Sequence, residues 1–338
     1  MKRLSLALVL VFTLALAARG QEIQDGIIIL PEQDPLDFSG DIVIAGSSTV
    51  FPLTNRMAQR FTEDGFLGKI TIDSIGTGAG FERFCVSGDS DISNASRAIR
   101  AAEVDKCRAN GREPLEFRVG TDALVVVVNN DNDFVKDLSL EELALLFSTA
   151  KLWSDVRPEF PAEPIARFIP GTDSGTFDFF VEAVFKGDEA AILAADNLRL
   201  SEDDDVLAKG IEANQYAVGF FGFAYLASHI DRVHAIAVEG VEPNEQSAED
   251  GSYPLARPLF IYSDAKIMTD KPQVAAFIGY YLSLVNEEIL DVGYFPASDD
   301  ALNLAKNTWL AAMGLPAFDL EDEAEATPEA TAEATARP

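Results

Sequence analysis

Short apolar runs, each bounded by glycine or by polar residues, recur along the central part of this chain and predict strands. Residues 41–45 form one such run after an aspartate, and residues 69–74 alternate between apolar and polar positions. Residues 123–128 form the strongest predicted strand, because a continuous run of branched apolar residues is typical of burial on both faces. We therefore expect strands at these three places, the first two of which lead into glycine-rich loops.

Between the strands, apolar residues recur at helical spacing. Leu53, Met57 and Phe61 are four positions apart and would share one helix face. Apolar residues return at similar spacing after Gly175, and residues 139–142 have the Ser-x-x-Glu pattern of a capping box. Strand, loop and helix thus alternate, which predicts an α/β fold with parallel strands and a ligand site at their carboxyl ends.

Both ends of the chain differ from this pattern. Two basic residues, an apolar run and small residues predict a signal peptide over residues 1–20. Residues 21–40 have the composition of a linker, apart from the apolar run 27–30, and residues 317–338 predict a disordered acidic tail rich in Glu, Ala and Thr. No cysteine lies near the apolar run, so we expect a periplasmic or extracellular protein without a lipid anchor.

The charge and the cysteine count narrow the possible functions. With 338 residues the chain is long enough for two domains or lobes, and its formal net charge of −30 argues against nucleic acid and anionic membranes as partners. Cys85 and Cys107 lie in the predicted exported part, where an oxidising compartment favours a disulfide between them. The alternative is a pair of buried free thiols. The two histidines are far from both cysteines, so we expect no metal site and no cofactor.

Three loops share one composition, and each precedes a predicted helix. They combine glycine with hydroxyl residues at 45–52, 76–80 and 171–177. A helix N-terminus has unpaired N–H groups and the positive end of the helix dipole, so it suits an oxyanion. Three such loops together predict an anion held between converging helix N-termini.

Six segments match a known family in order and spacing. They are Gly46-Ser-Ser-Thr-Val-Phe-Pro52, Gly76-Thr-Gly-Ala-Gly-Phe81, Asp91-Ile-Ser-Asn-Ala-Ser-Arg97, Gly171-Thr-Asp-Ser-Gly-Thr176, Gly219-Phe-Phe-Gly222 and Tyr253-Pro-Leu-Ala-Arg-Pro-Leu259. Over about residues 41–314 the chain resembles the phosphate-binding subunits of bacterial ABC importers, which have the type II periplasmic binding protein fold.

The resemblance implies two α/β lobes that close around one phosphate. Lobe I would comprise residues 41–121 and 254–316, and lobe II residues 122–253, with two strands crossing between them near 120–125 and 253–262. The family's role implies a monomeric receptor that passes inorganic phosphate to an ABC permease and is not an enzyme. On the second crossing strand, we expect Arg257 to contact a neighbouring carboxylate or carbonyl.

The family's phosphate contacts can be transferred position by position. The resemblance implies phosphate contacts in both lobes, at Ser48, Thr49, Val50, Thr77 and Gly78 in lobe I and at Ser174, Gly175 and Thr176 in lobe II. For Ser47 and Ser48, ordinary helix capping is the alternative.

The chain departs from the best-known family members at two positions. Arg97 occupies the position of a lobe I aspartate, and Pro170 that of a lobe II arginine. We therefore hypothesise that the charged pair is exchanged across the cleft. Arg97 would bind phosphate through its guanidinium, and Asp173 would accept the phosphate proton or pair with Arg97. The alternatives are a surface ion pair for Arg97 and local turn capping for Asp173.

Two other functions remain open at this point. Ser174 could be the nucleophile of a serine hydrolase, which would need His229 or His234 as its base. An extracellular protein that senses oxyanions or binds a partner could use the same fold, and ligand binding alone would not distinguish it from a transport receptor.

Overall fold

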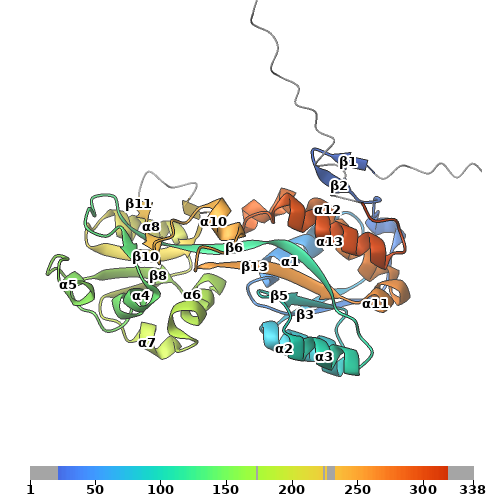
Figure 1. Ribbon diagram of the computed structural model, residues 1–338, viewed down its shortest axis with the longest axis horizontal. Coiled ribbons are helices and arrows are strands. Elements are labelled where there is room, and N and C mark those ends of the chain that lie inside the picture. The colour runs from blue at the N-terminus through green and yellow to red at the C-terminus, as the bar shows by residue number, and fades with distance from the viewer. Residues whose placement is uncertain (1–21, 173, 224, 227–232, 319–338) are drawn as a thin grey trace, which may run out of the picture.

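The computed structural model describes residues 22–172, 174–223, 225–226 and 233–318. The predicted signal peptide and nearly all of the predicted acidic tail lie outside these residues. Within them, nine strands form one sheet in the order β4-β3-β5-β13-β6-β10-β8-β9, with β11 (Val233–Ala235) paired to β6. Figure 1 shows this sheet running through two α/β bodies.

One body, which we call lobe I, contains three parallel strands, and the sequence predicted the first two of them. They are β3 (Ile42–Gly46), β4 (Ile70–Ser74) and β5 (Ile92–Ala95). A large core lies between this sheet and three helices: α1 (Phe51–Glu63), α12 (Pro272–Val292) and α13 (Asp299–Ala312). The predicted helix face of Leu53, Met57 and Phe61 is fully buried in this core. The smaller helices of lobe I are α2 (Thr77–Glu82), its continuation η2 (Arg83–Ser87), α3 (Ala101–Ala109) and α11 (Ala265–Asp270).

The other body, lobe II, repeats the arrangement with its own core. Its parallel strands are β8 (Ala166–Pro170), β9 (Leu198–Ser201) and β10 (Ala217–Gly222). Its helices are α4 (Leu140–Leu146), α5 (Trp153–Val156), α6 (Gly175–Phe185), α7 (Glu189–Leu193), α8 (Asp204–Glu212) and α10 (Glu245–Glu249). The short strands β7 (Asp137–Leu138) and β12 (Ala237–Val238) pair beside them. The predicted capping box opens α4, with Ser139 and Glu142 bonded reciprocally.

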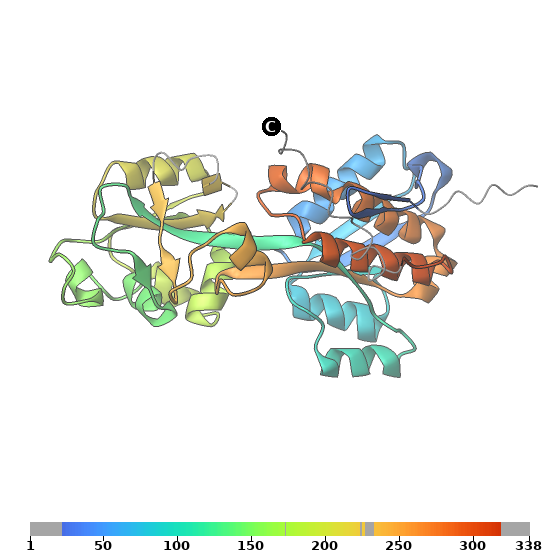
Figure 2. The same cartoon turned by 45° about the horizontal axis from the view of Figure 1, so that its top comes forward.

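Two long strands connect the lobes. They are β6 (Leu115–Asn129) and β13 (Ala256–Ser263), which pair antiparallel and run between the two bodies in Figures 1 and 2. The family resemblance implied that the chain crosses between the lobes near 120–125 and 253–262, and these two strands contain most of both segments. The lobe boundaries at 121/122 and 253/254 remain a prediction.

Residues 22–30 differ from the linker that the sequence predicted. They form a hairpin of β1 (Glu22–Gln24) and β2 (Ile27–Ile29) that packs against α13. Asn303 accepts a hydrogen bond from the backbone N–H of Ile28, and Lys306 donates to its carbonyl, each at 2.8 Å. The side chain of Ile28 is fully buried in the lobe I core, so burial of this apolar run explains the difference.

The buried Lys306 makes stability in this region depend on pH. Burial lowers the pKa of Lys306 to about 8, whereas the pKa of a lysine in an unfolded chain is about 10.4. Between these values the unfolded chain binds more protons than the folded one, so the lysine's contribution to the free energy of unfolding rises with pH. In urea denaturation, we expect wild type to gain stability relative to Lys306→Met as the pH rises from about 8 to about 10. A constant difference between the two proteins would contradict this.

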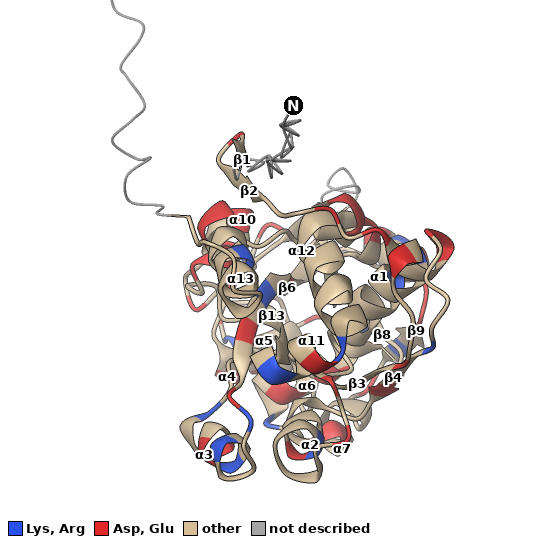
Figure 3. Cartoon of the chain, turned by 90° about the vertical axis from the view of Figure 1, so that its right-hand side faces the viewer, with Lys and Arg blue, Asp and Glu red and all other residues tan. Residues whose placement is uncertain are grey.

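No helix among the described residues is both long enough and apolar enough to cross a membrane. Figure 3 shows acidic residues on many surface elements, with basic and acidic residues mixed on α3.

Candidate anion-binding site

A cleft of about 290 Å³ lies between the first two glycine-rich loops, which belong to lobe I, and helix α6 of lobe II. Its lining residues come from the first two loops, from the segment before α3, from α6 and from β13. They are Ser47, Ser48, Thr49, Gly76, Thr77, Gly78, Ser96, Arg97, Arg100, Asp178, Glu182 and Arg257. Five of the predicted phosphate-binding residues therefore line one cavity: Ser48, Thr49, Thr77, Gly78 and Arg97.

The first loop follows β3 and turns sharply into α1. Gly46 has φ +142° and packs against the backbone of Asn94, so a side chain there would clash. The Oγ of Ser47 accepts from the N–H of Val50 at 3.4 Å in the turn before α1, so the predicted residue Val50 does not have a free N–H. The N–H groups of Ser48 and Thr49 have no acceptor among the described residues, so these two donors remain available to an anion.

The second loop lies beside the first and begins α2. Gly76 has φ +84° and donates its N–H to the carbonyl of Gly46 at 2.9 Å, which fixes the two loops together. The Thr77 hydroxyl lies 3.2 Å from the Ser96 hydroxyl and accepts from the N–H of Ser96 at 3.2 Å. The first N–H groups of α2 follow directly, and a helix start leaves such groups unpaired.

The third loop begins α6 and approaches the first loop across the cleft. A Cβ added at Gly175 would lie 3.8 Å from the Cα of Thr49, so the two loops pass close to each other here. Ser174 is the N-cap of α6, and its Oγ accepts from the N–H of Thr176 at 3.2 Å. Asp173 lies outside the described residues. The predicted lobe II residues Ser174, Gly175 and Thr176 thus form the start of α6 near the lobe I loop, but none of the three lines the cleft.

Arg97 is held in a fixed orientation at the lobe I side of the cleft. Its Nη1 and Nη2 donate to the two carboxylate oxygens of Glu103 at 2.8 and 2.7 Å, and its guanidinium lies 5.5 Å from the centre of the Phe81 ring. Partial burial would raise the pKa of Glu103, but hydrogen bonds from Arg97 and from the N–H of Arg100 outweigh it and lower this pKa. Arg97 therefore both forms an ion pair and lines the cleft, with Glu103 as its partner.

The predicted disulfide supports this side of the site. Cys85 and Cys107 are bonded and buried, which confirms the prediction. The bond joins η2, which continues the helix begun at Thr77, to α3, whose first turn contains Glu103. It therefore links the elements that carry Thr77 and the partner of Arg97.

Comparisons with known proteins agree with this architecture. A family model described as the PBP superfamily domain matches residues 31–284. The chain belongs to this superfamily. Protein SphX from Synechocystis sp. is 39% identical over 80% of this chain and 83% of its own length. The phosphate-binding protein PstS of Staphylococcus saprophyticus is 34% identical over 75% of this chain and 80% of its own length.

A solved structure has a similar fold. The crystal structure of a possible phosphate-binding protein from Planctomyces limnophilus superposes with a TM-score of 0.76 at 33% identity, covering 82% of this chain and 99% of that one. Together these matches confirm the predicted fold class and the resemblance to phosphate-binding proteins such as PstS within the PBP superfamily.

In this member of the PBP superfamily, Arg257 makes the contacts that the sequence predicted and also lines the cleft. Its Nε donates to Asp122 at 3.0 Å and its Nη2 to the carbonyl of Gly175 at 3.3 Å, as expected of a residue that contacts a carboxylate or a carbonyl. The sequence did not show that Arg257 also lines the cleft. Burial raises the pKa of Asp122, and the guanidinium of Arg257 opposes this shift.

Two acidic residues of α6 face the same cleft. Asp178 and Glu182 are one helical turn apart, and Glu182 lies 3.9 Å from Nη1 of Arg257. Partial burial raises the pKa of Asp178, although the positive charge of Arg257 opposes the shift. Arg100 lines the opposite wall, and its guanidinium makes no ion pair within the described residues. None of these three side chains was predicted from the sequence.

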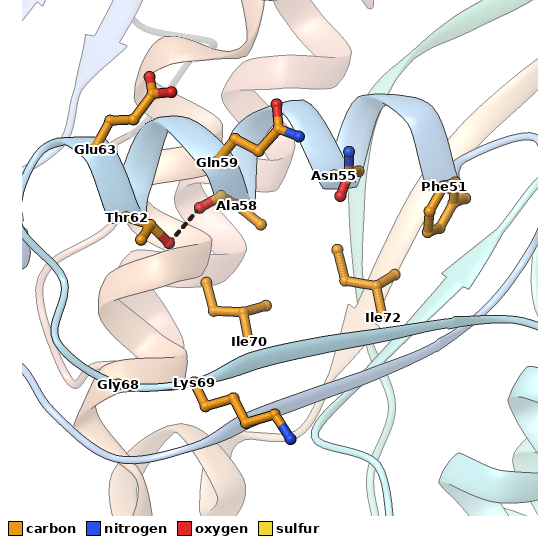
Figure 4. Close-up of a pocket in the computed structure, with 10 residues that line it drawn as sticks. All are labelled: Phe51, Asn55, Ala58, Gln59, Thr62, Glu63, Gly68, Lys69, Ile70 and Ile72. Atoms are coloured by element: carbon orange, nitrogen blue, oxygen red, sulfur yellow. Dashed lines mark hydrogen bonds between the residues drawn. The ribbon is translucent and has the colours of Figure 1, made fainter.

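A larger hollow of about 580 Å³ lies between α1 and the edge strand β4 (Figure 4). Apolar side chains such as Ile70 and Ile72 line it together with Gln59 and Lys69. It shares no lining residue with the cleft, so it is separate from the candidate site.

Proposed function

We propose that this chain is an extracytoplasmic receptor that binds inorganic phosphate and delivers it to an ABC importer. The observation that supports it most is the meeting of two lobe I loops, Arg97, Arg257 and helix α6 around one cleft. The family supplies the ligand class, because relatives across most of this chain's length are phosphate-binding proteins.

The chemistry of the cleft suits a small tetrahedral oxyanion. The N–H groups of Ser48 and Thr49, the hydroxyl of Thr77 and the start of α6 supply donors at fixed positions, with the guanidinium of Arg97 beside them. Fixed donors in a partly enclosed cleft bind an anion despite the large negative charge of the chain, because exposed charges beyond about 10 Å are screened by salt. Hinge motion at β6 and β13 would enclose the ligand.

Asp173 remains the proposed acceptor for the phosphate proton. Within the described residues, Arg97 pairs with Glu103, so an ion pair with Asp173 is not needed to hold its guanidinium. A carboxylate that faces the anion repels sulfate, which carries no proton at neutral pH, and accepts a hydrogen bond from hydrogen phosphate. The exchange of charges across the cleft is thus proposed as Arg97 in lobe I and Asp173 in lobe II.

A binding role is favoured over hydrolysis. Ser174 acts as a helix cap, and His234 lines a different hollow together with Val135 and Lys136. His229 lies outside the described residues. We propose that the protein is a monomer, is not an enzyme, and works in the periplasm or outside the cell after export. A sensing or partner-binding role on the same fold is the alternative function.

Titration calorimetry on the mature protein, freed of ligand by partial unfolding, tests this proposal. At pH 7 we expect tight binding of phosphate and no measurable binding of sulfate. Failure to bind phosphate would contradict the receptor role. The matched variant Asp173→Asn should gain sulfate binding, because it removes the repelling charge, and sulfate binding unchanged from wild type would exclude Asp173 as the acceptor.

A further inference from the structure

The guanidinium of Arg257 lies at the floor of the cleft, where the lobes meet. Arg257 belongs to β13, one of the two strands that connect the lobes, and only 8% of its surface is exposed. It lies 3.8 Å above the ring of Phe179 on α6 and donates to the carbonyl of Gly175 at the start of that helix. The side chain therefore reaches from the connecting strand to the loop that faces Thr49.

Not all of its donors are used by the protein. An arginine has five N–H donors in a planar fork. Nε donates to Asp122 and one N–H of Nη2 to Gly175, while within the described residues Nη1 makes no hydrogen bond and has only Glu182 at 3.9 Å. Glu182 is largely exposed, so it does not satisfy this buried end of the fork. Arg257 lines the cavity that Thr49, Thr77 and Arg97 also line.

The cleft offers oriented N–H donors at this place and no excess of positive charge, because Asp178 and Glu182 also line it. Arg97 is paired with Glu103, and Arg257 is paired with Asp122. Each guanidinium therefore presents N–H donors to the cleft without adding net positive charge. The position at which the family resemblance implies a lobe II arginine holds Pro170, which ends β8. Arg257 brings a guanidinium to the end of the same loop by another route, from the connecting strand.

We propose that Arg257 is a phosphate-binding residue of this receptor, donating from Nη1 and Nη2 to the anion that Arg97 holds from the other side. This inference rests on the proposed function. Two guanidiniums then face one tetrahedral anion, and the second is attached to the strand about which the lobes move. Anion binding would thereby tighten the contacts of Arg257 with Gly175 and Phe179, which favours the closed arrangement of the lobes.

The test compares Arg257→Lys with Arg118→Lys by phosphate titration. Lysine keeps the charge but loses the planar fork, so we expect phosphate affinity to fall about 10- to 100-fold in Arg257→Lys. Arg118 is a matched control, since it lies on the other connecting strand, pairs with Glu249 at 2.9 Å and does not line the cleft. Its variant should bind phosphate within about threefold of wild type, because it loses no contact to the anion.

A crystal structure of the wild-type protein with phosphate tests whether Arg257 contacts the anion, even if Arg257→Lys does not fold. Nη1 or Nη2 within hydrogen-bond distance of a phosphate oxygen would support the inference. A phosphate held by Arg97 and the loops with no contact to Arg257 would overturn it, as would Arg257→Lys binding as tightly as wild type. These two outcomes leave the receptor role intact, whereas wild-type protein that binds no phosphate defeats both proposals.

Discussion

Replacing Arg97 by alanine should weaken phosphate binding by about 100-fold. Hydrogen bonds from a guanidinium to an anion contribute about 1.5 to 3 kcal/mol each, and loss of about 3 kcal/mol corresponds to about two orders of magnitude in the dissociation constant. The side chain is already oriented by Glu103 and Phe81, so little conformational entropy opposes its use in binding. Calorimetric titration at pH 7 measures the effect.

Arg100→Ala is the matched control for this experiment. Arg100 lines the same cleft, but no hydrogen bond holds its guanidinium within the described residues, and the side chain is exposed. An exposed, mobile charge contributes little, so we expect a change of less than about fivefold. Equal losses in the two variants would mean that the cleft attracts phosphate by its overall charge. Wild-type affinity in Arg97→Ala would exclude the proposed charge exchange.

The sequence predicted those parts of the fold that depend on neighbouring residues. The alternation at 69–74, the apolar face of Leu53, Met57 and Phe61, and the capping box at Ser139 all depend on residues within one element, and the structure contains each of them. The glycine-rich loops were equally visible, because a positive φ at Gly46 and at Gly76 is a local requirement. That these loops converge was predicted from the composition they share, and the family resemblance divided them between two lobes.

Contacts between distant residues could not be predicted in this way. Asp122 and Arg257 are 135 positions apart, and Ile28 and Asn303 are 275 apart, so no local pattern connects either pair. An isolated arginine in an apolar strand does not reveal whether it faces a carboxylate or a cleft. Likewise, the short apolar run at 27–30 gave no indication that it packs beside Lys306 on the last described helix. These pairings depend on the tertiary fold.

The disulfide joins two elements that local packing alone would hold weakly. α3 has only Cys107 buried along its length, and its other side chains are partly or fully exposed. The bond connects it to η2 across a sequence separation of 22 residues. It therefore contributes to the position of α3, whose first turn holds Glu103 against Arg97.

The double variant Cys85→Ala/Cys107→Ala should lose about 3 kcal/mol in the free energy of unfolding, because the unfolded chain regains the entropy that the closed loop removes. Urea denaturation with and without a reducing agent measures it, and the variant should no longer respond to reduction. We also expect weaker phosphate binding in the variant, because Thr77 and the Glu103–Arg97 pair lie on the two elements that the bond joins. A free energy of unfolding within about 1 kcal/mol of wild type would show that packing alone holds α3.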